Sequence, residues 1–419
     1  MTTPQTDAGV FRLIGPGLIV AATGIGAGDI VSATMAGSSL GLTLLWVVAL
    51  AAFLKSFLNE GIARWQLATG TTAIEGWCTQ LPRWVGIYFG AYLVVWTTSV
   101  AAALSSACGL GLATLTGGAV PRPLGAVLHS VVGCGFVVVG GFAGFEKAMK
   151  GLIAVMFGSI VVCAALTFPG PGPVLEGLIV PVIPGGAGTS VLSVLGGIGG
   201  SIAMLAYNYW LREEQMVGAK WLRFVRRDIA IAYVYTAVFG MSVMIVANQT
   251  FYVSGTTLTN AQAVTKMAET LATIIGPIGF YAYAVGFWAT VFASLLGIWQ
   301  SIPYLFADYY GLVRGYSPTD RRALTDVRST PYRAALGFIT VVAIPFAFLD
   351  QPLFLVRAFT IIGSLFIPFL AATLLYLNNV RIPAGGEVPR NSPLTNAVLA
   401  LAMVLFTVIV LRDVGLLAR

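Results

Sequence analysis

The first long apolar segment of the chain is interrupted by Gly24-Ile25-Gly26-Ala27-Gly28-Asp29, and the sixth is interrupted by Gly196-Gly197-Ile198-Gly199-Gly200-Ser201. Glycine-rich stretches of this kind predict breaks, because glycine destabilises the interior of a helix. Inside a bilayer, an unwound backbone persists only where it is buried in protein or lines a cavity, since no water satisfies its N–H and C=O groups. Two breaks at matching positions in two halves of a chain are typical of transporters with one binding site near the bilayer midplane.

The composition predicts an all-α polytopic membrane protein. Hydrophobic residues make up 58% of the 419 residues, charged residues 9%, and the mean hydropathy is +0.88. A soluble domain carries about a quarter of charged residues, so that class is excluded. Windows of about 19 apolar residues predict roughly eleven spans, near 13–40, 43–68, 84–112, 124–142, 149–168, 190–212, 229–250, 278–305, 333–349, 353–377 and 395–412.

The basic residues predict the orientation of these spans. With the N-terminus in the cytoplasm, the outer loops keep little more than Arg122, Lys266 and Arg357, and most other Lys and Arg residues lie inside. The net charge of +7 is therefore expected to meet anionic lipid, and no motif indicates a nucleic-acid partner. The first apolar run is too long for a removable signal peptide and lacks a cleavage site. We expect an integral protein of a bacterial inner or plasma membrane.

The organisation predicted is one transporter domain, 1–419, built from two inverted halves. The first repeat covers about 12–168, the second about 190–377, and an extra helix covers about 395–412. An odd number of spans in each repeat makes the two repeats run in opposite senses across the membrane. The segment 168–188 connects the halves. The basic loops after the sixth and eighth spans are expected to be solvated.

Several ordered landmarks resemble those of the Nramp metal transporters, also known as SLC11-like proteins. They are Gly15-Pro16-Gly17, the run Ala36-Gly37-Ser38-Ser39-Leu40-Gly41, Phe145-Glu146-Lys147, the segment around Met204, and Arg227-Asp228-Ile229-Ala230. The likeness covers nearly the whole chain. It implies the LeuT-type fold of that family, with five plus five inverted spans and the first and sixth helices broken.

The resemblance also implies a metal site, and here the chain departs from the family. Nramp proteins carry Asp-Pro-Gly-Asn in the first break, where this chain has Gly26-Ala27-Gly28-Asp29, so the metal-binding carboxylate is missing and the asparagine position holds Asp29. In the sixth helix, the family's alanine carbonyl ligand falls on Ser201 and its methionine thioether on Met204. A glutamine of the family's tenth helix aligns with Phe366.

The family's proton-transfer residues are missing as well. Its Met-Pro-His is Met204-Leu205-Ala206 here, its second histidine falls on Leu211, and its acidic pair falls on Ser99 and Ala102. The one histidine of the chain, His129 in the fourth span, cannot form a relay by itself. We expect His129 to be a packed or interfacial residue.

The altered site favours a small anion. Half-helices that start near Gly28 and near Tyr207 would direct free N–H groups and positive dipole ends at the midplane. Glycine at 26 and 28 leaves the backbone open to a small oxyanion. We therefore expect transport of a small inorganic oxyanion such as bicarbonate by alternating access, without a cofactor and with coupling to Na⁺ left open. The expected binding residues are Gly26, Ala27, Gly28, Asp29, Ser201, Met204, Tyr207 and Asn208.

Two charged residues near the breaks have alternative interpretations. Lys55 lies in the middle of the second span, where a charge costs about 2.5–3.5 kcal/mol and needs a partner. It would either offset an anionic substrate, form a structural pair with Glu60, Asp29 or Glu214, or extend to the interface. Asp29 would either cap free N–H groups or contact an ion directly.

Two other functions are weighed as alternatives. A divalent cation, Mg²⁺ or Mn²⁺, is the family's usual substrate class, and Asp29, Ser201 and Met204 would then be its ligands. A membrane-embedded enzyme would require clustered His and acidic residues within the spans. The spans lack such clusters, so we expect no enzyme activity. The oligomeric state is not determined by the sequence.

Overall fold

The computed structural model describes residues 19, 23–255 and 263–413. This part of the chain is helical, and 10 of its helical segments are long and apolar enough to cross a membrane. The expected span 13–40 is described mainly as α2 (Ala27–Leu40), which is too short to count among the 10. The prediction of an all-α polytopic membrane protein with about eleven spans is confirmed.

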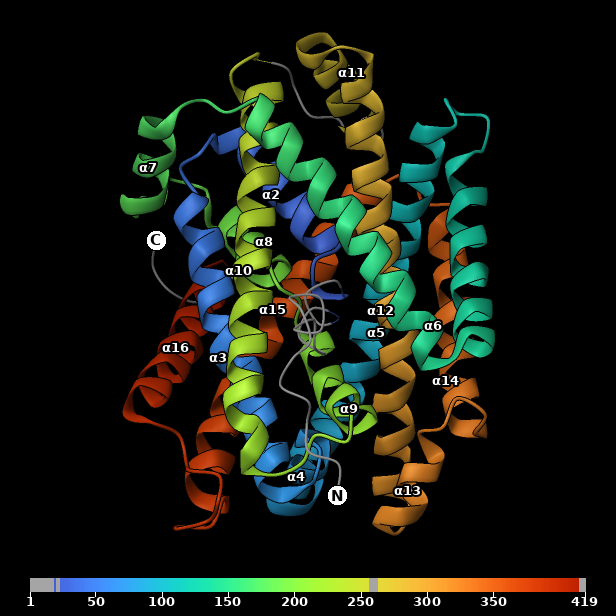
Figure 1. The fold of residues 1–419 in the computed structure, drawn as a ribbon, viewed down its shortest axis with the longest axis vertical. Helices are drawn as coiled ribbons and strands as arrows, with labels where there is room; N and C mark the ends of the chain where they lie inside the picture. Colours follow the sequence, from blue (N-terminus) through green and yellow to red (C-terminus); the bar gives the residue numbers. More distant parts are fainter. Residues whose placement is uncertain (1–18, 20–22, 256–262, 414–419) are drawn as a thin grey trace, which may run out of the picture.

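The first half forms a series of helices that cross the molecule in alternating directions (Figure 1). After α2 come α3 (Leu45–Thr69), the short α4 (Ala73–Gln80), α5 (Arg83–Leu115) and α6 (Arg122–Leu166). The expected fourth and fifth spans are both parts of α6, as Arg122–Gly140 and Gly144–Leu166. These two limbs of α6 run in opposite directions.

A short helix, α7 (Pro171–Ile179), forms within the connection between the halves, where proline at its first position suits a helix start. The second half then contains α8 (Gly188–Gly197), η2 (Ile202–Leu205), α9 (Ala206–Glu213), η3 (Ala219–Trp221), α10 (Leu222–Ala247), η4 (Asn248–Tyr252), α11 (Ala263–Ile275), α12 (Pro277–Val313), α13 (Pro318–Leu324), α14 (Thr330–Ala347), α15 (Pro352–Tyr376), η5 (Leu377–Arg381) and α16 (Pro393–Asp413).

Both predicted breaks are present, and a 3₁₀ turn follows the second one. Gly199 and Gly200 each have φ +74°, a left-handed conformation that favours glycine. After this turn, the N–H of Met204 donates to the carbonyl oxygen of Ser201 at 3.1 Å, so a 3₁₀ turn begins at Ile202. The α-helix itself, α9, begins at Ala206, so the expected start of the second half-helix near Tyr207 is confirmed, and the 3₁₀ turn Ile202–Leu205 precedes it.

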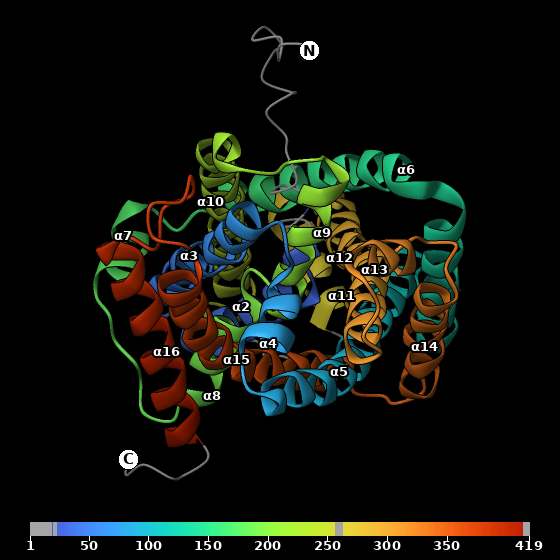
Figure 2. The ribbon, with the colours of Figure 1, turned by 90° about the horizontal axis from the view of Figure 1, so that it is seen from below.

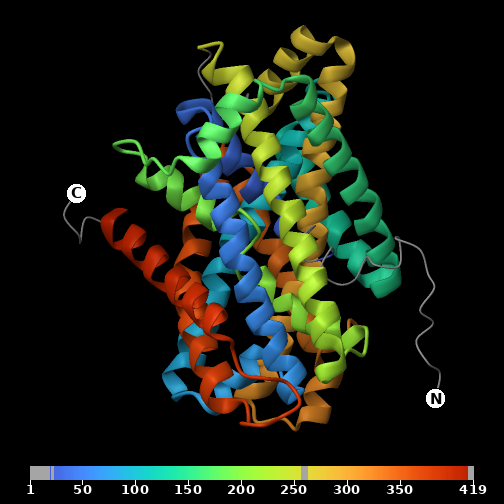
Figure 3. The same cartoon turned by 60° about the vertical axis from the view of Figure 1, so that its left-hand side comes forward.

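The broken segments lie inside the bundle. In an 18-residue apolar stretch of Gly188–Glu213, 89% of the residues are buried, against 28% in the corresponding stretches of Gly144–Leu166 and Pro393–Arg412. Figure 2 places α2 near the middle and α6, α14 and α16 at the rim. In Figure 3, α16 leans outward beside the other helices. Burial of the breaks is what a bilayer requires of unwound backbone.

The two broken segments touch through glycine. A Cβ atom on Gly197 would lie 2.6 Å from the carbonyl oxygen of Gly28, so the backbones of α8 and α2 approach too closely for a side chain. The end of the molecule that carries α4, α9 and α13, at the bottom of Figure 1, also carries most of the Arg and Lys residues and is called the basic end below.

Candidate functional site

A small cavity lies between the two breaks. It measures about 10 Å³, the room that about one water molecule needs. Its walls come from the two broken segments and from α5, α12 and α15. The lining residues are Thr23, Gly24, Gly26, Gly28, Trp96, Val100, Gly197, Gly200, Ser201, Ala203, Ser294, Ile298 and Phe359.

Three of the expected binding residues line this cavity. Gly26 and Gly28 come from the start of α2, and Ser201 comes from the second break. The other expected residues are buried nearby but do not line it: Ala27, Asp29, Met204, Tyr207 and Asn208. Their roles in binding stay predictions.

Asp29 joins the two breaks. Its side chain is fully buried, and its Oδ2 atom accepts a hydrogen bond of 3.0 Å from the N–H of Gly26. Its Oδ1 atom accepts a hydrogen bond of 3.0 Å from the N–H of Gly199. These are the contacts of a capping residue, extended across to the second broken helix. Both carboxylate oxygens are thereby engaged by the backbone.

Lys55 caps the end of α8. Its Nζ atom is fully buried and donates hydrogen bonds to the carbonyl oxygens of Gly196, at 3.0 Å, and Ile198, at 2.5 Å. The last carbonyls of a helix lack partners within the helix and carry partial negative charge. An ammonium group at this place therefore satisfies them and neutralises the end of the helix dipole.

The expected acidic partners of Lys55 make other contacts. Glu60 forms ion pairs with Arg64 on its own helix and with Arg226 on α10, the latter at 2.9 Å. The opposite charges of Asp29 and Lys55 attract one another, although no ion pair joins them directly in the described part of the chain. Backbone carbonyls, which the sequence analysis did not consider, are the partners of Lys55.

Two hydrogen bonds join residues of the cavity wall. Trp96 Nε1 on α5 donates to Ser201 Oγ at 3.0 Å. Ser294 Oγ on α12 donates to the carbonyl oxygen of Thr23 at 2.9 Å. Trp96 and Ser294 were not among the expected binding residues, because a single Trp or Ser in an apolar span has no sequence pattern that marks it as part of a site. The Thr23 hydroxyl, buried at the cavity wall, has no hydrogen-bond partner.

The half-helix α9 directs its polar groups away from the cavity. The Tyr207 hydroxyl donates to Asp228 Oδ2 on α10 at 3.0 Å. The side-chain amide of Asn208 is buried with neither atom hydrogen-bonded. Met204 is fully buried in the apolar core. Tyr207 therefore anchors α9 to α10.

The chemistry of the lining is that of hydroxyl, indole and backbone groups. Among the described residues that line the cavity, none carries a carboxylate, imidazole or thioether group. Within the described residues, no group of three or more His, Cys, Asp and Glu side chains is placed to hold a metal ion. His129 is buried, with Nδ1 2.7 Å from the carbonyl oxygen of Gly125 and Nε2 accepting from Trp288 Nε1 at 2.8 Å. These contacts are those of the packed residue that was expected.

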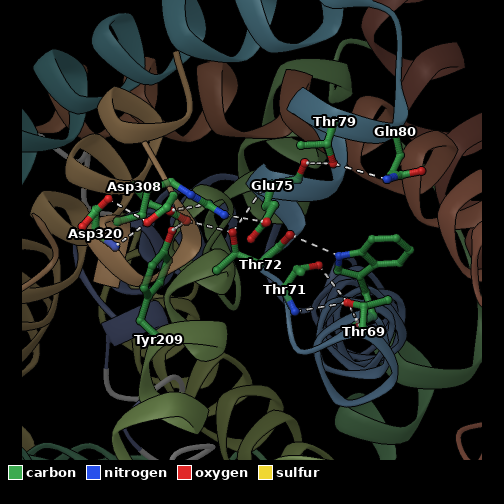
Figure 4. A network of polar contacts seen from close by, with 12 residues as sticks. Thr69, Thr71, Thr72, Glu75, Thr79, Gln80, Tyr209, Asp308 and Asp320 are labelled. Carbon is green, nitrogen blue, oxygen red and sulfur yellow. Dashed lines mark hydrogen bonds and ion pairs between the residues drawn. The ribbon is translucent and has the colours of Figure 1, made fainter. Parts of the chain in front are cut away.

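A buried polar network closes the basic end below the site (Figure 4). Asp308 Oδ2 on α12 accepts from Thr72 Oγ1 and from the Tyr209 hydroxyl, each at 2.8 Å. Arg321 on α13 donates to Asp308 Oδ1 at 3.2 Å and to Glu75 Oε1 at 2.5 Å. The exposed fraction is 2% for Asp308 and 5% for Arg321. The network ties α9 to α4, α12 and α13.

This network corrects the expectation that the loop after the eighth span is simply solvated. Arg321 lies in that loop and is buried, because two carboxylates from other elements satisfy its guanidinium. The same carboxylates and hydrogen bonds raise the pKa of Arg321, against the opposing effect of its burial. Thr72 and Asp308 are 236 positions apart and Glu75 and Arg321 are 246 apart, so no local pattern indicated that they meet.

Known proteins resemble this chain along most of its length. The family model for natural resistance-associated macrophage protein-like proteins matches residues 17–416. The divalent metal cation transporter MntH of Bacillus subtilis is 28% identical over 261 residues, which cover 59% of this chain and 60% of that protein. MntH of Klebsiella pneumoniae is 26% identical over 301 residues, 68% of this chain and 71% of that protein. Natural resistance-associated macrophage protein 1 of Bos taurus is 28% identical over 248 residues, and the match spans 43% of its length.

Solved structures share the fold. The Eremococcus coleocola manganese transporter, in complex with an aromatic bis-isothiourea substituted compound, superposes with a TM-score of 0.71 at 16% identity, covering 97% of this chain and 88% of that one. MhsT in complex with L-phenylalanine superposes with a TM-score of 0.57 at 16% identity, covering 94% of this chain and 98% of that one. The expected LeuT-type fold is confirmed. Because the family model matches nearly the whole sequence, the chain belongs to the natural resistance-associated macrophage protein (Nramp) family of membrane transporters.

Proposed function

We propose that this protein transports a small inorganic oxyanion by alternating access, with bicarbonate as the first substrate to test. One observation carries the proposal. The carbonyl oxygens at the breaks that would serve a cation are occupied by the chain's own donors, Lys55 at Gly196 and Ile198 and Ser294 at Thr23. Gly26 and Gly28, at the start of α2, line the cavity without a side chain that would cover their backbone.

A divalent cation fits this site poorly. Such an ion takes several oxygen ligands, normally including a carboxylate. Asp29 is the carboxylate beside the breaks, and both of its oxygens accept backbone N–H groups. A metal ion at the end of α8 would also have to displace the ammonium of Lys55, which carries the same sign of charge.

A small anion fits it better. The first N–H groups of a helix have no acceptor within the helix, and the dipole there favours negative charge. The charges of Asp29 and Lys55 offset one another, which leaves the positive end of α2 at the cavity wall. Bicarbonate is planar and carries one charge, with oxygens to accept these N–H groups. Its hydroxyl finds an acceptor in Ser201 or in Thr23, whose hydroxyl lacks a partner.

The size of the cavity requires a change of conformation during transport. The cavity volume of about 10 Å³ is enough for about one water molecule. Bicarbonate is larger than this cavity, and a hydrated metal ion is far larger. Access would come from movement of the broken helices around the site, as in other transporters of this architecture. We place the N-terminus and the basic end on the cytoplasmic side of a bacterial inner or plasma membrane.

Transport of Mg²⁺ or Mn²⁺ is the second candidate. Its support is the names of the relatives, which are divalent metal cation transporters and a manganese transporter. Asp29, Ser201 and Met204 would be the ligands, although Met204 does not line the cavity. We propose no cofactor and no enzyme activity, since the lining offers no acid–base pair. Coupling to Na⁺ is tested by repeating the liposome uptake assay described below without sodium and comparing the uptake.

Paired uptake assays in liposomes separate the two candidates. A trapped pH indicator reports bicarbonate entry as alkalinisation of the lumen, the opposite sign from CO₂ that crosses the bilayer unaided. A trapped metal dye reports Mn²⁺ or Mg²⁺. Alkalinisation that requires both protein and bicarbonate, without a metal signal, supports the anion. Metal entry without alkalinisation overturns it and makes Asp29 a candidate metal ligand.

A glycine pair supplies the matched control for these assays. Gly26 lines the cavity, and a Cβ atom there would lie 2.3 Å from Ser294 Oγ. Gly151 lies on the exposed face of α6 with open space around it. Gly26→Val is expected to abolish uptake in folded protein, while Gly151→Val leaves it unchanged.

A further inference from the structure

A basic groove runs along the start of α10 at the basic end of the molecule. It has a volume of about 270 Å³ and is lined by Lys220, Arg223, Phe224, Arg227, Asp228 and Ile231. These residues are spaced three or four apart and therefore share one face of the η3–α10 segment. The groove lies outside the cavity between the breaks, with which it shares no lining residue.

The three cations of the groove are available to a ligand. Within the described part of the chain, no ion pair joins Lys220, Arg223 or Arg227 to an acidic side chain. Lys220 lies 5.9 Å from the ring of Trp221. Their neighbour Arg226 differs, because its half-exposed side chain forms an ion pair with Glu60 on α3 at 2.9 Å. Arg226 thus pairs with an acidic residue of α3, whereas Lys220, Arg223 and Arg227 line the groove.

Apolar residues continue the groove along the outer face of α10. The exposed fraction is 44% for Ile231 and 61% for Val234, one turn further into the membrane span. Cations at the end of a span followed by an apolar stripe match the two parts of a phospholipid, the phosphate group and the acyl chains. A soluble anion would use the cations alone. The stripe therefore favours a lipid over free phosphate.

We propose that this groove binds the headgroup of an anionic phospholipid from the leaflet at the basic end. The phosphate would lie among Lys220, Arg223 and Arg227, and the acyl chains would follow Ile231 and Val234. Asp228 at the floor of the groove accepts the hydroxyl of Tyr207 on α9. A bound lipid would thus hold the start of α10 against the half-helix that follows the second break, and would stabilise the folded transporter.

Native mass spectrometry of the purified full-length protein tests the site without any transport assay. The protein is offered phosphatidylglycerol or phosphatidylcholine in detergent, and retention of each is compared. The test variant is R223Q/R227Q. The matched control, R322Q/R328Q, removes the same two charges from exposed positions on α13 and the following loop of the same end.

Wild type and the control are expected to retain phosphatidylglycerol in preference to phosphatidylcholine. In R223Q/R227Q, the affinity is expected to fall by about tenfold or more, since each Lys or Arg near a lipid surface contributes about 1 kcal/mol. R223K/R227K, which keeps both charges, is expected to restore retention and shows that loss is not a folding failure. Equal retention in the test and control variants would overturn the site.

A second arm separates lipid from soluble phosphate. Thermal unfolding is followed in detergent with phosphatidylglycerol, with phosphatidylcholine, and with inorganic phosphate alone. Phosphatidylglycerol is expected to raise Tm in wild type but not in R223Q/R227Q. If inorganic phosphate raises Tm as much as the lipid does, the ligand is a soluble anion and the lipid assignment fails. Neither arm depends on which ion the protein transports.

Discussion

The Nζ atom of Lys55 on α3 lies 2.5 Å from the carbonyl oxygen of Ile198, the residue that directly follows α8. A positive side chain therefore occupies the place where a broken helix presents partial negative charge. Asp29 makes the complementary contact, since its carboxylate accepts an N–H from each break. Both charged residues therefore bind backbone groups of the breaks.

Replacing Lys55 with methionine is expected to destabilise the protein and to impair uptake. The carbonyl oxygens of Gly196 and Ile198 would lose a charged donor in a buried place, and hydrogen bonds to charged groups contribute about 1.5–3 kcal/mol each. Thermal unfolding in detergent measures the loss. The control is Lys150→Met, which breaks an exposed pair with Glu146 on α6. An equal Tm for the two variants would show that Lys55 does not hold the break.

Replacing Gly26 with alanine is expected to abolish uptake through a collision with one side chain. The new Cβ atom would lie 2.3 Å from Ser294 Oγ and 2.5 Å from Ser294 Cβ. The double variant Gly26→Ala with Ser294→Gly removes both atoms and is expected to regain the lost Tm and part of the uptake. Overpacking of this kind costs about 1–3 kcal/mol. Failure of the second change to raise Tm would argue against the close approach of α2 and α12.

Replacing Asp29 with asparagine discriminates between its two roles. As a cap, Asp29 accepts two backbone N–H groups, and an amide can accept only one of them. The expected result is a lower Tm, by the equivalent of about 1–3 kcal/mol, and no metal binding in either protein. Isothermal titration with Mn²⁺ and thermal unfolding are the measurements. Metal binding by the wild type that the variant loses, with Tm unchanged, would establish Asp29 as a ligand.

Breaking the network at the basic end is expected to cost more than breaking an exposed ion pair. Asp308→Ala leaves the buried guanidinium of Arg321 with Glu75 alone and removes the acceptor of Thr72 and Tyr209. Removing one partner of a buried pair costs about 3–5 kcal/mol, against about 0–1 kcal/mol for an exposed pair such as Glu146 with Lys150. The Tm of Asp308→Ala and Lys150→Ala gives the comparison. A smaller shift for Asp308→Ala would show that the network is not stabilising.

The ionisation of the Cys78 thiol on α4 depends on the same network. Burial, followed by the nearby Asp308 carboxylate, raises the pKa of its thiol from 9.0 to about 11. The folded protein therefore holds this proton more tightly than the unfolded chain, and stability contributed by the thiol is lost as pH rises from about 9 towards 11. Alkylation by a maleimide, which requires the thiolate, is expected to be slow at neutral pH and to rise about tenfold per pH unit.

The alkylation is measured in a variant that keeps Cys78 and replaces Cys108, Cys134 and Cys163 with alanine. Adding Asp308→Asn removes a negative charge beside the thiol, so the pH profile is expected to move to lower pH. An unmoved profile would show that Asp308 does not influence Cys78.

The sequence by itself determined the class of protein, the breaks and the departures from the metal and proton residues of the family. Transfer into a bilayer depends on the composition of each span, so apolar runs indicated the membrane class without knowledge of their packing. The glycines at 24–28 and 196–200 indicated where the helices stop, because helix formation is local. The replacement of the family's metal and proton residues by Gly26 and Leu211 is likewise readable from one position at a time.

Only the tertiary structure decided what the charged residues contact. The cost of burying Lys55 predicted that it has a partner, but the partner lies 143 positions away and is a carbonyl oxygen, a group that every residue carries. Arg321 and Glu75 are separated by 246 positions, so their contact likewise depends on how the chain folds. Hydrogen bonds and ion pairs act over a few ångströms, so they depend on how the helices pack, and that packing is a property of the whole chain rather than of any local stretch.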